Sequence, residues 1–275
     1  MKRGVYKPVK ATIEKIVTET SNIKTFTFKP VEPIPFLAGQ FVELTLPGFG
    51  EAPFTPSSSP AVRERFDITI MRAGSVTEKL HALEPGVEVG IRGPLGQPYP
   101  LDKYKGREVL ILGGGVGLAP LRALLLAMFE EIDTYKKIIV RFGARSPGDI
   151  VYRSAVEKAW GHLDKVDILG TVDKADDTWK GNVGVVTKIL EKDKLTCDPV
   201  TGVAVVCGPP IMMKFGTFKL LDLGYAPENI YLSMEKNMSC GIGKCGHCRI
   251  GPYYACKDGP VFTYAQIKDE SKIFD

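Results

Sequence analysis

The chain has 275 residues, of which 44% are hydrophobic and 25% charged, and its 36 basic and 32 acidic side chains leave a net charge of +4. This composition is typical of a globular protein and excludes a disordered or fibrous chain. The charges are interleaved without a basic run, so nucleic acid is not an expected partner. No stretch approaches ~18 consecutive apolar residues and the N-terminus has no apolar leader, so we expect no membrane insertion and a cytoplasmic location.

Residues 1–100 are predicted to form an antiparallel β-barrel. Short β-rich runs with alternating apolar residues follow one another, separated by Pro/Gly turns. One helical piece, residues 75–83, interrupts them. Short, regularly spaced strands with many turns are typical of small antiparallel barrels.

Residues 101–233 are predicted to form a parallel α/β domain. A buried strand at 109–112 leads into a glycine turn at 113–117 and a helix at 118–132. Four more strand-like runs follow: KKIIVRFGAR, KVDILGTVD, TGVAVVCGPP and ENIYLSMEK. The helical stretches between them are near 149–160, 185–192 and 210–223. Strands that alternate with helices predict a parallel sheet with right-handed crossovers.

The turn GGGVG is a candidate nucleotide-binding loop. A strand, a glycine turn and a helix offer a pyrophosphate bare backbone and a helix N-terminus. The strict G-x-G-x-x-G spacing fails because Pro120 stands where the third glycine would fall, so a glycine-rich turn without a ligand remains the alternative. Ligands on parallel sheets bind at the carboxyl ends of strands, where both GGGVG and CGPP fall. The residues expected to approach the pyrophosphate are Gly113, Gly114, Gly115, Val116 and Gly117.

Four of the six cysteines, Cys240, Cys245, Cys248 and Cys256, have the spacing C-x4-C-x2-C-x7-C. A reducing cytosol favours a metal or catalytic role for them over disulfides. Zinc sites usually pair two C-x2-4-C knuckles, whereas three cysteines in one loop match the plant-type ferredoxin pattern for a 2Fe-2S cluster. Glycines between the ligands would let the backbone wrap closely around inorganic sulfide. We therefore favour 2Fe-2S over zinc, and interpret His247 as a solvent-facing loop residue because four thiolates already complete the site.

Six motifs together resemble the ferredoxin-NADP reductase superfamily along nearly the whole chain. They are APFTPSS, MRAGSVTEKLHAL, RGPLG, GGGVGLAPL, CGPPIMM and MEKNMSCGIGKCGHC. Within the superfamily the chain is most similar to electron-transfer subunits: the gamma subunit of cytosolic sulfhydrogenases and the corresponding subunits of anaerobic sulfite reductase and dihydroorotate dehydrogenase. The resemblance implies an antiparallel flavin-binding barrel, a Rossmann-like domain and a 2Fe-2S subdomain at residues 234–275.

The resemblance also implies that the barrel binds FAD. The residues that would border the flavin or lie along it are Pro53, Phe54, Thr55, Ile70 and Arg72. The residues that would hold its pyrophosphate at a helix N-terminus, with the Ser75 and Thr77 hydroxyls as extra donors, are Gly74, Ser75, Val76 and Thr77. One position departs from the family, because Ala52 stands where the reductase motif has an arginine that clamps a flavin phosphate. Arg72 is the nearest candidate to supply that charge; a solvated charge at a strand end is the alternative.

For the nicotinamide, the resemblance places Cys207, Gly208 and Pro209 near the ring. Cys207 is the candidate catalytic residue, and inert packing of a buried cysteine is the alternative. The strand that ends in FGARS carries Arg145 rather than an acid, which favours NADPH or the use of both nucleotides. An ordinary exposed surface arginine is the alternative for Arg145.

The three sites together predict a diaphorase subunit. Hydride would pass between nicotinamide and flavin as two electrons, and the cluster would carry electrons singly to or from a partner. The sequence shows no site for sulfite, hydrogen, sulfur or orotate, so the expected partner is a catalytic redox subunit in a heteromeric complex, or a ferredoxin-like carrier. The alternatives are a redox-sensing module without turnover, a dihydroorotate dehydrogenase electron-transfer subunit and a self-sufficient reductase.

Overall fold

The computed structural model describes residues 4–191 and 197–274 and divides into two compact units. The first comprises Met1–Tyr99, Arg122–Ala127 and Met234–Val261, and the second Pro100–Leu121, Met128–Ser233 and Phe262–Asp275. Most of the cysteine-rich segment therefore packs in the same unit as the first hundred residues. Among the helices of the described residues, none is long and apolar enough to cross a membrane.

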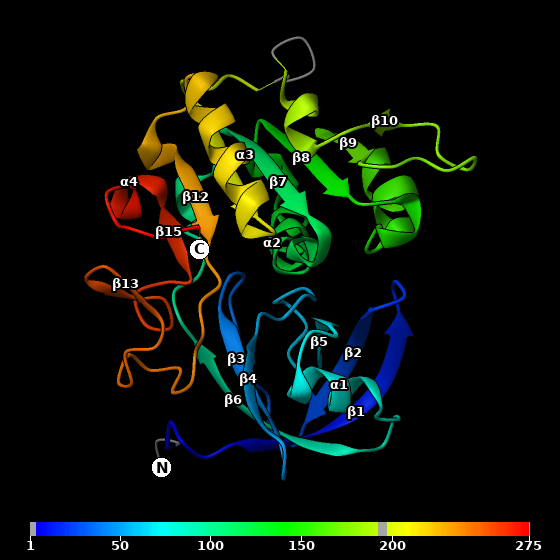
Figure 1. Ribbon diagram of the computed structural model, residues 1–275, viewed down its shortest axis with the longest axis vertical. Coiled ribbons are helices and arrows are strands. Elements are labelled where there is room, and N and C mark those ends of the chain that lie inside the picture. Colours follow the sequence, from blue (N-terminus) through cyan, green and yellow to red (C-terminus); the bar gives the residue numbers. More distant parts are fainter. Residues whose placement is uncertain (1–3, 192–196, 275) are drawn as a thin grey trace. The chain divides into compact units, whose positions relative to one another are not determined.

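The first unit is built on a six-stranded antiparallel sheet with the order β4-β3-β6-β1-β2-β5 (Figure 1). Its strands are β1 (Val9–Thr18), β2 (Ile23–Pro30), β3 (Phe41–Leu46), β4 (Gly50–Phe54), β5 (Phe66–Met71) and β6 (Glu88–Leu95). An antiparallel bridge between Pro56 and Ile68 joins the continuation of β4 to β5, so the two edges of the sheet meet. The predicted barrel is confirmed, and so is its helix, which is α1 (Ser75–His81).

The barrel core forms because apolar side chains alternate along the strands. In β1, for example, Val9, Ala11 and Ile13 are buried, whereas Lys10 is exposed. Strand β3 departs from this pattern because its first four residues, 41–44, are all buried. Both faces of β3 are therefore covered by protein.

The second unit contains a seven-stranded sheet with the order β10-β9-β8-β7-β11-β12-β15. Its strands are β7 (Glu108–Gly114), β8 (Lys137–Ala144), β9 (Val166–Val172), β10 (Asn182–Val183), β11 (Val203–Cys207), β12 (Ile230–Ser233) and β15 (Val261–Thr263). The pairings from β10 through to β12 are all parallel, as predicted. Further α-helices are α2 (Leu118–Glu130), α3 (Pro210–Asp222) and α4 (Tyr264–Ile267). A short hairpin in the first unit pairs β13 (Arg249–Ile250) with β14 (Tyr253–Tyr254).

Two of the predicted helices are not α-helical. The stretch 149–160 is instead a 3-10 turn at Pro147–Asp149, a π-helical turn at Ala155–Ala159 and a 3-10 turn at Trp160–His162. Tyr152, with φ 55°, lies in this stretch, and a left-handed residue cannot continue a right-handed helix.

Over 185–191, the described part of the predicted helix 185–192, the structure has a 3-10 helix at Val186–Leu190. The β-branched run VVT at its start disfavours an α-helix, and Lys192 lies outside the described residues. The remaining 3-10 turns are at Leu101–Lys103, Gly115–Gly117, Ile132–Thr134 and Pro227–Asn229.

Candidate cofactor-binding sites

The glycine loop lies at the position in the parallel sheet where the strand order reverses. From the central strand β7 the chain continues to β8 on one side, and it returns to β11 on the other. The carboxyl ends of β7 and β11 are adjacent, because Gly113 pairs with Cys207. A crevice for a nucleotide is expected at such a switch point.

The loop backbone is open at Gly115 and tightly packed at Gly117. Gly115 has a φ of +53°, and a Cβ added at Gly117 would lie 2.5 Å from both the Cys207 carbonyl oxygen and the Gly208 Cα. These are backbone atoms, which cannot move aside as a flexible side chain can. Gly117 thus lets the start of α2 lie directly against the end of β11. Sequence reasoning placed the turn at 113–117, but the strand continues to Gly114 and the 3-10 turn occupies Gly115–Gly117.

A small pocket adjoins this loop at the ends of β7 and β8. Gly115, Phe142 and Asp149 are among the residues that line it. The Arg145 side chain is 77% exposed, and its Nη2 lies 3.4 Å from Asp149 Oδ1. Since Asp149 also lines the pocket, Arg145 stays a candidate for nucleotide contact.

The CGPP segment follows β11. Cys207 is 7% exposed, Gly208 is half-buried and Pro209 is exposed. The Cys207 side chain is thus largely covered, and Pro209 is the most accessible of the three. Their assignment to the nicotinamide stays a prediction.

The candidate flavin residues lie on neighbouring strands of the first unit. Pro53 and Phe54 end β4, and Thr55 follows it; all three are half-buried. Ile70 is buried near the end of β5, and the exposed Arg72 follows that strand. Since β4 and β5 are joined by the closing bridge, these residues belong to one side of the barrel.

The turn before α1 differs in one respect from the prediction. The Thr77 hydroxyl donates to the Gly74 carbonyl and accepts from the Ala73 and Gly74 amides, each at 2.9 Å. Its proton is therefore used within the turn, and Thr77 is not the free donor that we expected. Gly74 has an extended backbone and serves as the N-cap.

The cysteine-rich loop directs backbone amides at sulfur. The Gly243 amide donates to Cys256 Sγ at 3.0 Å, and the Lys244 amide donates to Cys240 Sγ at 3.3 Å. Burial opposes ionisation of the Cys240 thiol, but donors led by the Ile242 amide outweigh burial and lower its pKa to about 6. Metals bind the thiolate form, so the fold of this loop prepares a ligand.

The four thiols come together in pairs. Cys248 Sγ lies 3.2 Å from Cys256 Sγ, and the Cys245 thiol donates to Cys240. All are free cysteines. Among residues 4–191 and 197–274, no three His, Cys, Asp or Glu side chains are grouped as ligands of a single metal ion. A centre with two metal ions needs only two protein ligands for each, so the paired thiols fit such a centre. His247 is exposed, as predicted, and its Nδ1 lies 2.7 Å from Ser239 Oγ.

Comparison with known proteins agrees with these sites. Residues 10–99 match the family described as oxidoreductase FAD-binding domain, and residues 111–217 match the oxidoreductase NAD-binding domain. Residues 235–268 match the iron-sulfur cluster binding domain of dihydroorotate dehydrogenase B. The chain is 37% identical over 268 residues to sulfhydrogenase 1 subunit gamma of Pyrococcus furiosus, covering 94% of this chain and 91% of that protein.

The chain belongs to the ferredoxin-NADP reductase superfamily. A second superfamily relative, named probable dihydroorotate dehydrogenase B (NAD(+)), electron transfer subunit, also from Pyrococcus furiosus, is 33% identical, with 94% of this chain and 91% of that protein covered. The solved structure of an NADH-dependent reduced ferredoxin-NADP oxidoreductase superposes with a TM-score of 0.74 at 26% identity, covering 97% of this chain and 91% of that chain. This superfamily member is thus an electron-transferring oxidoreductase subunit with FAD, nicotinamide nucleotide and iron-sulfur domains, as predicted.

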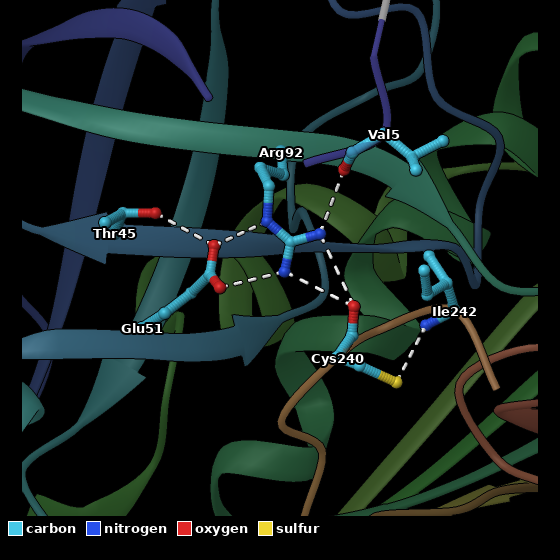
Figure 2. Close-up of polar contacts among 6 residues, drawn as sticks. All are labelled: Val5, Thr45, Glu51, Arg92, Cys240 and Ile242. Atoms are coloured by element: carbon cyan, nitrogen blue, oxygen red, sulfur yellow. Dashed lines mark hydrogen bonds and ion pairs between the residues drawn. The ribbon is translucent and has the colours of Figure 1, made fainter. Parts of the chain in front are cut away.

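Sequence reasoning missed two buried charged residues next to the cysteine-rich loop, Arg92 and Glu43. Arg92, in the quoted RGPLG motif, is 5% exposed and contacts Glu51 and the Cys240 carbonyl (Figure 2). Glu43 is 1% exposed on β3, and its Oε1 has no hydrogen-bond partner among the described residues. A Cβ on Gly241 would lie 3.1 Å from that oxygen. Both residues therefore lie beneath the cysteine-rich loop.

The buried Glu43 carboxyl predicts a pH dependence of stability. Burial, assisted by the Glu51 charge and opposed by Arg92, raises its pKa from 4.5 to about 8. The folded state therefore holds a proton that the unfolded state releases above pH 4.5. The stability that Glu43 contributes is fully present below that pH and falls by up to about 1.4 kcal/mol per pH unit as pH rises towards 8.

A Glu43→Gln variant should show a flatter dependence, since its side chain is always neutral. Urea titrations between about pH 5 and pH 8 measure this. Glu88→Gln, at an exposed β6 position paired with Lys10, is the control and should leave the slope unchanged. Equal slopes for Glu43→Gln and the parent would show that Glu43 is ionised in the folded state.

Arg72→Ala should weaken FAD retention by about 1.5 to 3 kcal/mol, the usual contribution of a charge-assisted hydrogen bond. The expectation follows from the resemblance, which places Ala52 where the reductase motif has an arginine that clamps a flavin phosphate. The dissociation constant for FAD, measured by fluorescence of released flavin, tests it. Arg63→Ala, an exposed site before β5, is the control. Equal affinity in all three proteins would exclude Arg72 as a phosphate ligand.

Proposed function

We propose that this chain is the diaphorase subunit of a larger redox complex. It exchanges electrons between NADH or NADPH and a catalytic partner subunit through FAD and a 2Fe-2S cluster. The observation that carries the proposal is the loop of four free thiols, with amides directed at sulfur, packed in one compact unit with the barrel that matches the FAD-binding family. When bound, nicotinamide and flavin supply hydride transfer and the cluster supplies one-electron transfer.

The cluster ligands are Cys240, Cys245, Cys248 and Cys256. Two contacts support a dinuclear centre: Cys240 with Cys245, and Cys248 with Cys256. In a 2Fe-2S cluster each iron takes two cysteine thiolates, so each pair would hold one iron. The backbone amides that donate to Cys240 Sγ and Cys256 Sγ would keep these hydrogen bonds in the bound cluster. Donors to ligand sulfur favour the more negatively charged, reduced state of the cluster.

The remaining site residues bind and orient the two nucleotides. The backbone of Gly115–Gly117 and the start of α2 would receive the nicotinamide nucleotide's pyrophosphate, beside Cys207, Gly208 and Pro209. Pro53, Phe54, Thr55 and Ile70 would contact the flavin. Arg72, the Ser75 hydroxyl and the backbone of the turn of Gly74, Ser75, Val76 and Thr77 would hold its phosphates.

The partner is proposed to be a cytoplasmic hydrogenase or an anaerobic sulfite or sulfur reductase. Two relatives named as sulfhydrogenase gamma subunits, 37% and 36% identical, support this class. A dihydroorotate dehydrogenase catalytic subunit is the second candidate, favoured by the family match of residues 235–268. A ferredoxin-like carrier would serve as an alternative acceptor. Cysteine-rich metal sites without disulfides are typical of a reducing compartment, which supports a cytoplasmic location.

The test is an anaerobic assay of the purified holoprotein. It should contain FAD, two irons and two acid-labile sulfides per chain, and it should reduce a viologen dye with NADH or NADPH. The ratio of kcat/KM for the two nucleotides decides the cofactor. Bound cofactors without dye reduction would favour the sensing module, and stoichiometric zinc without iron would refute the cluster.

Partner choice needs a second measurement. Co-expression with neighbouring reading frames, followed by size-exclusion chromatography, should yield a heteromeric complex. NAD(P)H-dependent hydrogen, sulfite, sulfur or orotate chemistry by that complex identifies the partner class. A chain that stays alone and reduces a small acceptor directly would contradict the subunit assignment.

A further inference from the structure

The first predicted ligand, Cys240, is held through its backbone by a buried arginine. Nη1 and Nη2 of Arg92 both lie 3.4 Å from the Cys240 carbonyl oxygen (Figure 2). Nε and Nη2 donate to the two carboxylate oxygens of Glu51 at 2.7 and 2.8 Å. Nη1 also donates to the Val5 carbonyl at 3.1 Å. A guanidinium has five N–H groups, and these five contacts use all of them.

The orientation of this guanidinium is fixed from the barrel side. A bidentate carboxylate pair permits one planar arrangement, and such charge-assisted pairs are the stronger kind of hydrogen bond. The Thr45 hydroxyl donates to Glu51 Oε1 at 2.9 Å and holds the carboxylate in turn. The Arg92 side chain is 6% exposed, so water competes little for these bonds.

The peptide after Cys240 packs against strands β6 and β3. Gly241 has a φ of +71°, and a Cβ there would lie 2.8 Å from Leu95 Cδ1 and 3.1 Å from Glu43 Oε1. The backbone therefore rests directly on β6 and β3. From this position the chain turns so that the Ile242 amide donates to Cys240 Sγ at 3.5 Å (Figure 2).

We infer that Arg92, clamped by Glu51, is the positioning residue of the cluster: it fixes the Cys240 peptide and thereby the amides directed at the Cys240 sulfur. The inference rests on the proposed 2Fe-2S site. Its consequence is that Arg92 sets how firmly iron is held at Cys240 and, through the nearby charges of Arg92 and Glu51, the midpoint potential of the cluster.

The test compares Arg92→Lys with the parent holoprotein. Lysine keeps the charge but cannot form the planar fork that joins Glu51 to the Cys240 carbonyl. Iron should be lost to an added chelator about ten- to a hundred-fold faster, and the electron paramagnetic resonance spectrum of the reduced cluster should change. FAD content should stay as in the parent.

Arg141→Lys is the matched control. Arg141 is likewise a buried arginine, 2% exposed in its side chain and 3.2 Å from the Asp167 carboxylate, but it lies on β8 in the other unit. It should lower stability without altering iron release or the spectrum. Similar changes in both variants would show general destabilisation and overturn the positioning role.

Charge and geometry are separated by Arg92→Gln, Glu51→Gln and the double variant. Arg92→Gln leaves the Glu51 charge unpaired near the cluster and should lower the midpoint potential. The double variant removes both charges, so the potential should return towards the parent while iron loss stays fast. Glu51→Gln keeps the arginine and provides a second test should the other variants fail to fold; its iron loss should lie between parent and Arg92→Lys.

Parent-like iron loss and spectra in both Arg92→Lys and Glu51→Gln would overturn the inference. A parent protein without iron would instead contradict the proposed cluster, so the two failures are distinguishable.

Discussion

A Cys245→Ser variant is expected to lose electron delivery to the partner while keeping NAD(P)H reduction of the flavin. Cys245 is the exposed thiol of the four, and its loss would leave Cys240 as the single proposed ligand of its pair. A serine hydroxyl is a poor replacement for a thiolate as an iron ligand. Hydride transfer needs the FAD-binding and NAD-binding domains alone, so flavin bleaching in a stopped-flow experiment should proceed at the parent rate.

Cys197→Ser is the control for this experiment. Cys197 is buried and lies outside the C-x4-C-x2-C-x7-C spacing, and burial raises its pKa to about 11, as befits an inert packed thiol. This variant should retain its iron and its electron delivery. A Cys245→Ser protein that still passes electrons to the partner would exclude Cys245 from the cluster.

Gly117→Ala should weaken nucleotide binding. The added methyl would lie 2.5 Å from backbone atoms of Cys207 and Gly208, so the glycine loop and the CGPP segment must separate. Overpacking of this kind typically costs about 1 to 3 kcal/mol of stability. The displaced loop amides should also raise KM for NAD(P)H by at least about ten-fold, since one lost charge-assisted hydrogen bond contributes ~1.5 kcal/mol or more.

Steady-state dye reduction and thermal unfolding measure these two effects. Gly161→Ala is the control, because no atom lies within 4 Å of a Cβ at Gly161 and its φ is unstrained. It should change stability by no more than about 0.5 kcal/mol. A Gly117→Ala protein with parent KM would show that the loop does not contact the nucleotide.

Local signals in the sequence were sufficient for the barrel, the parallel sheet and the long helices. The alternation of apolar residues in the strands and the glycine turn before α2 can be predicted because both depend on residues that are near one another in the sequence. The stretch 149–160 could not be predicted in this way. Its composition favours a helix, but Tyr152 adopts a left-handed backbone that only the surrounding structure selects.

The surface on which the cysteine-rich loop packs could not be predicted from the sequence, for a different reason. In FVELTL the alternation places Glu43 on the outer face of β3, where a carboxylate would ordinarily meet water. Gly241, far along the chain, covers that face. Arg92 likewise donates to the Cys240 carbonyl oxygen, a contact between distant residues that no local sequence pattern predicts. The sequence feature that could have indicated this contact was the charged residue at the start of the motif RGPLG.

Because the C-terminal segment covers β3, the barrel cannot complete its packing early in synthesis. Arg92 and Cys240 are separated by 148 positions, and Gln97 and Lys257, which are joined by a 3.1 Å hydrogen bond, by 160. Contacts of such separation are slow to form and cannot form until the later partner has left the ribosome. The barrel is translated first, yet the face of β3 that carries Glu43 is covered only after most of the second unit has been synthesised. The packing of this part of the barrel is therefore completed only once the cysteine-rich segment has been synthesised.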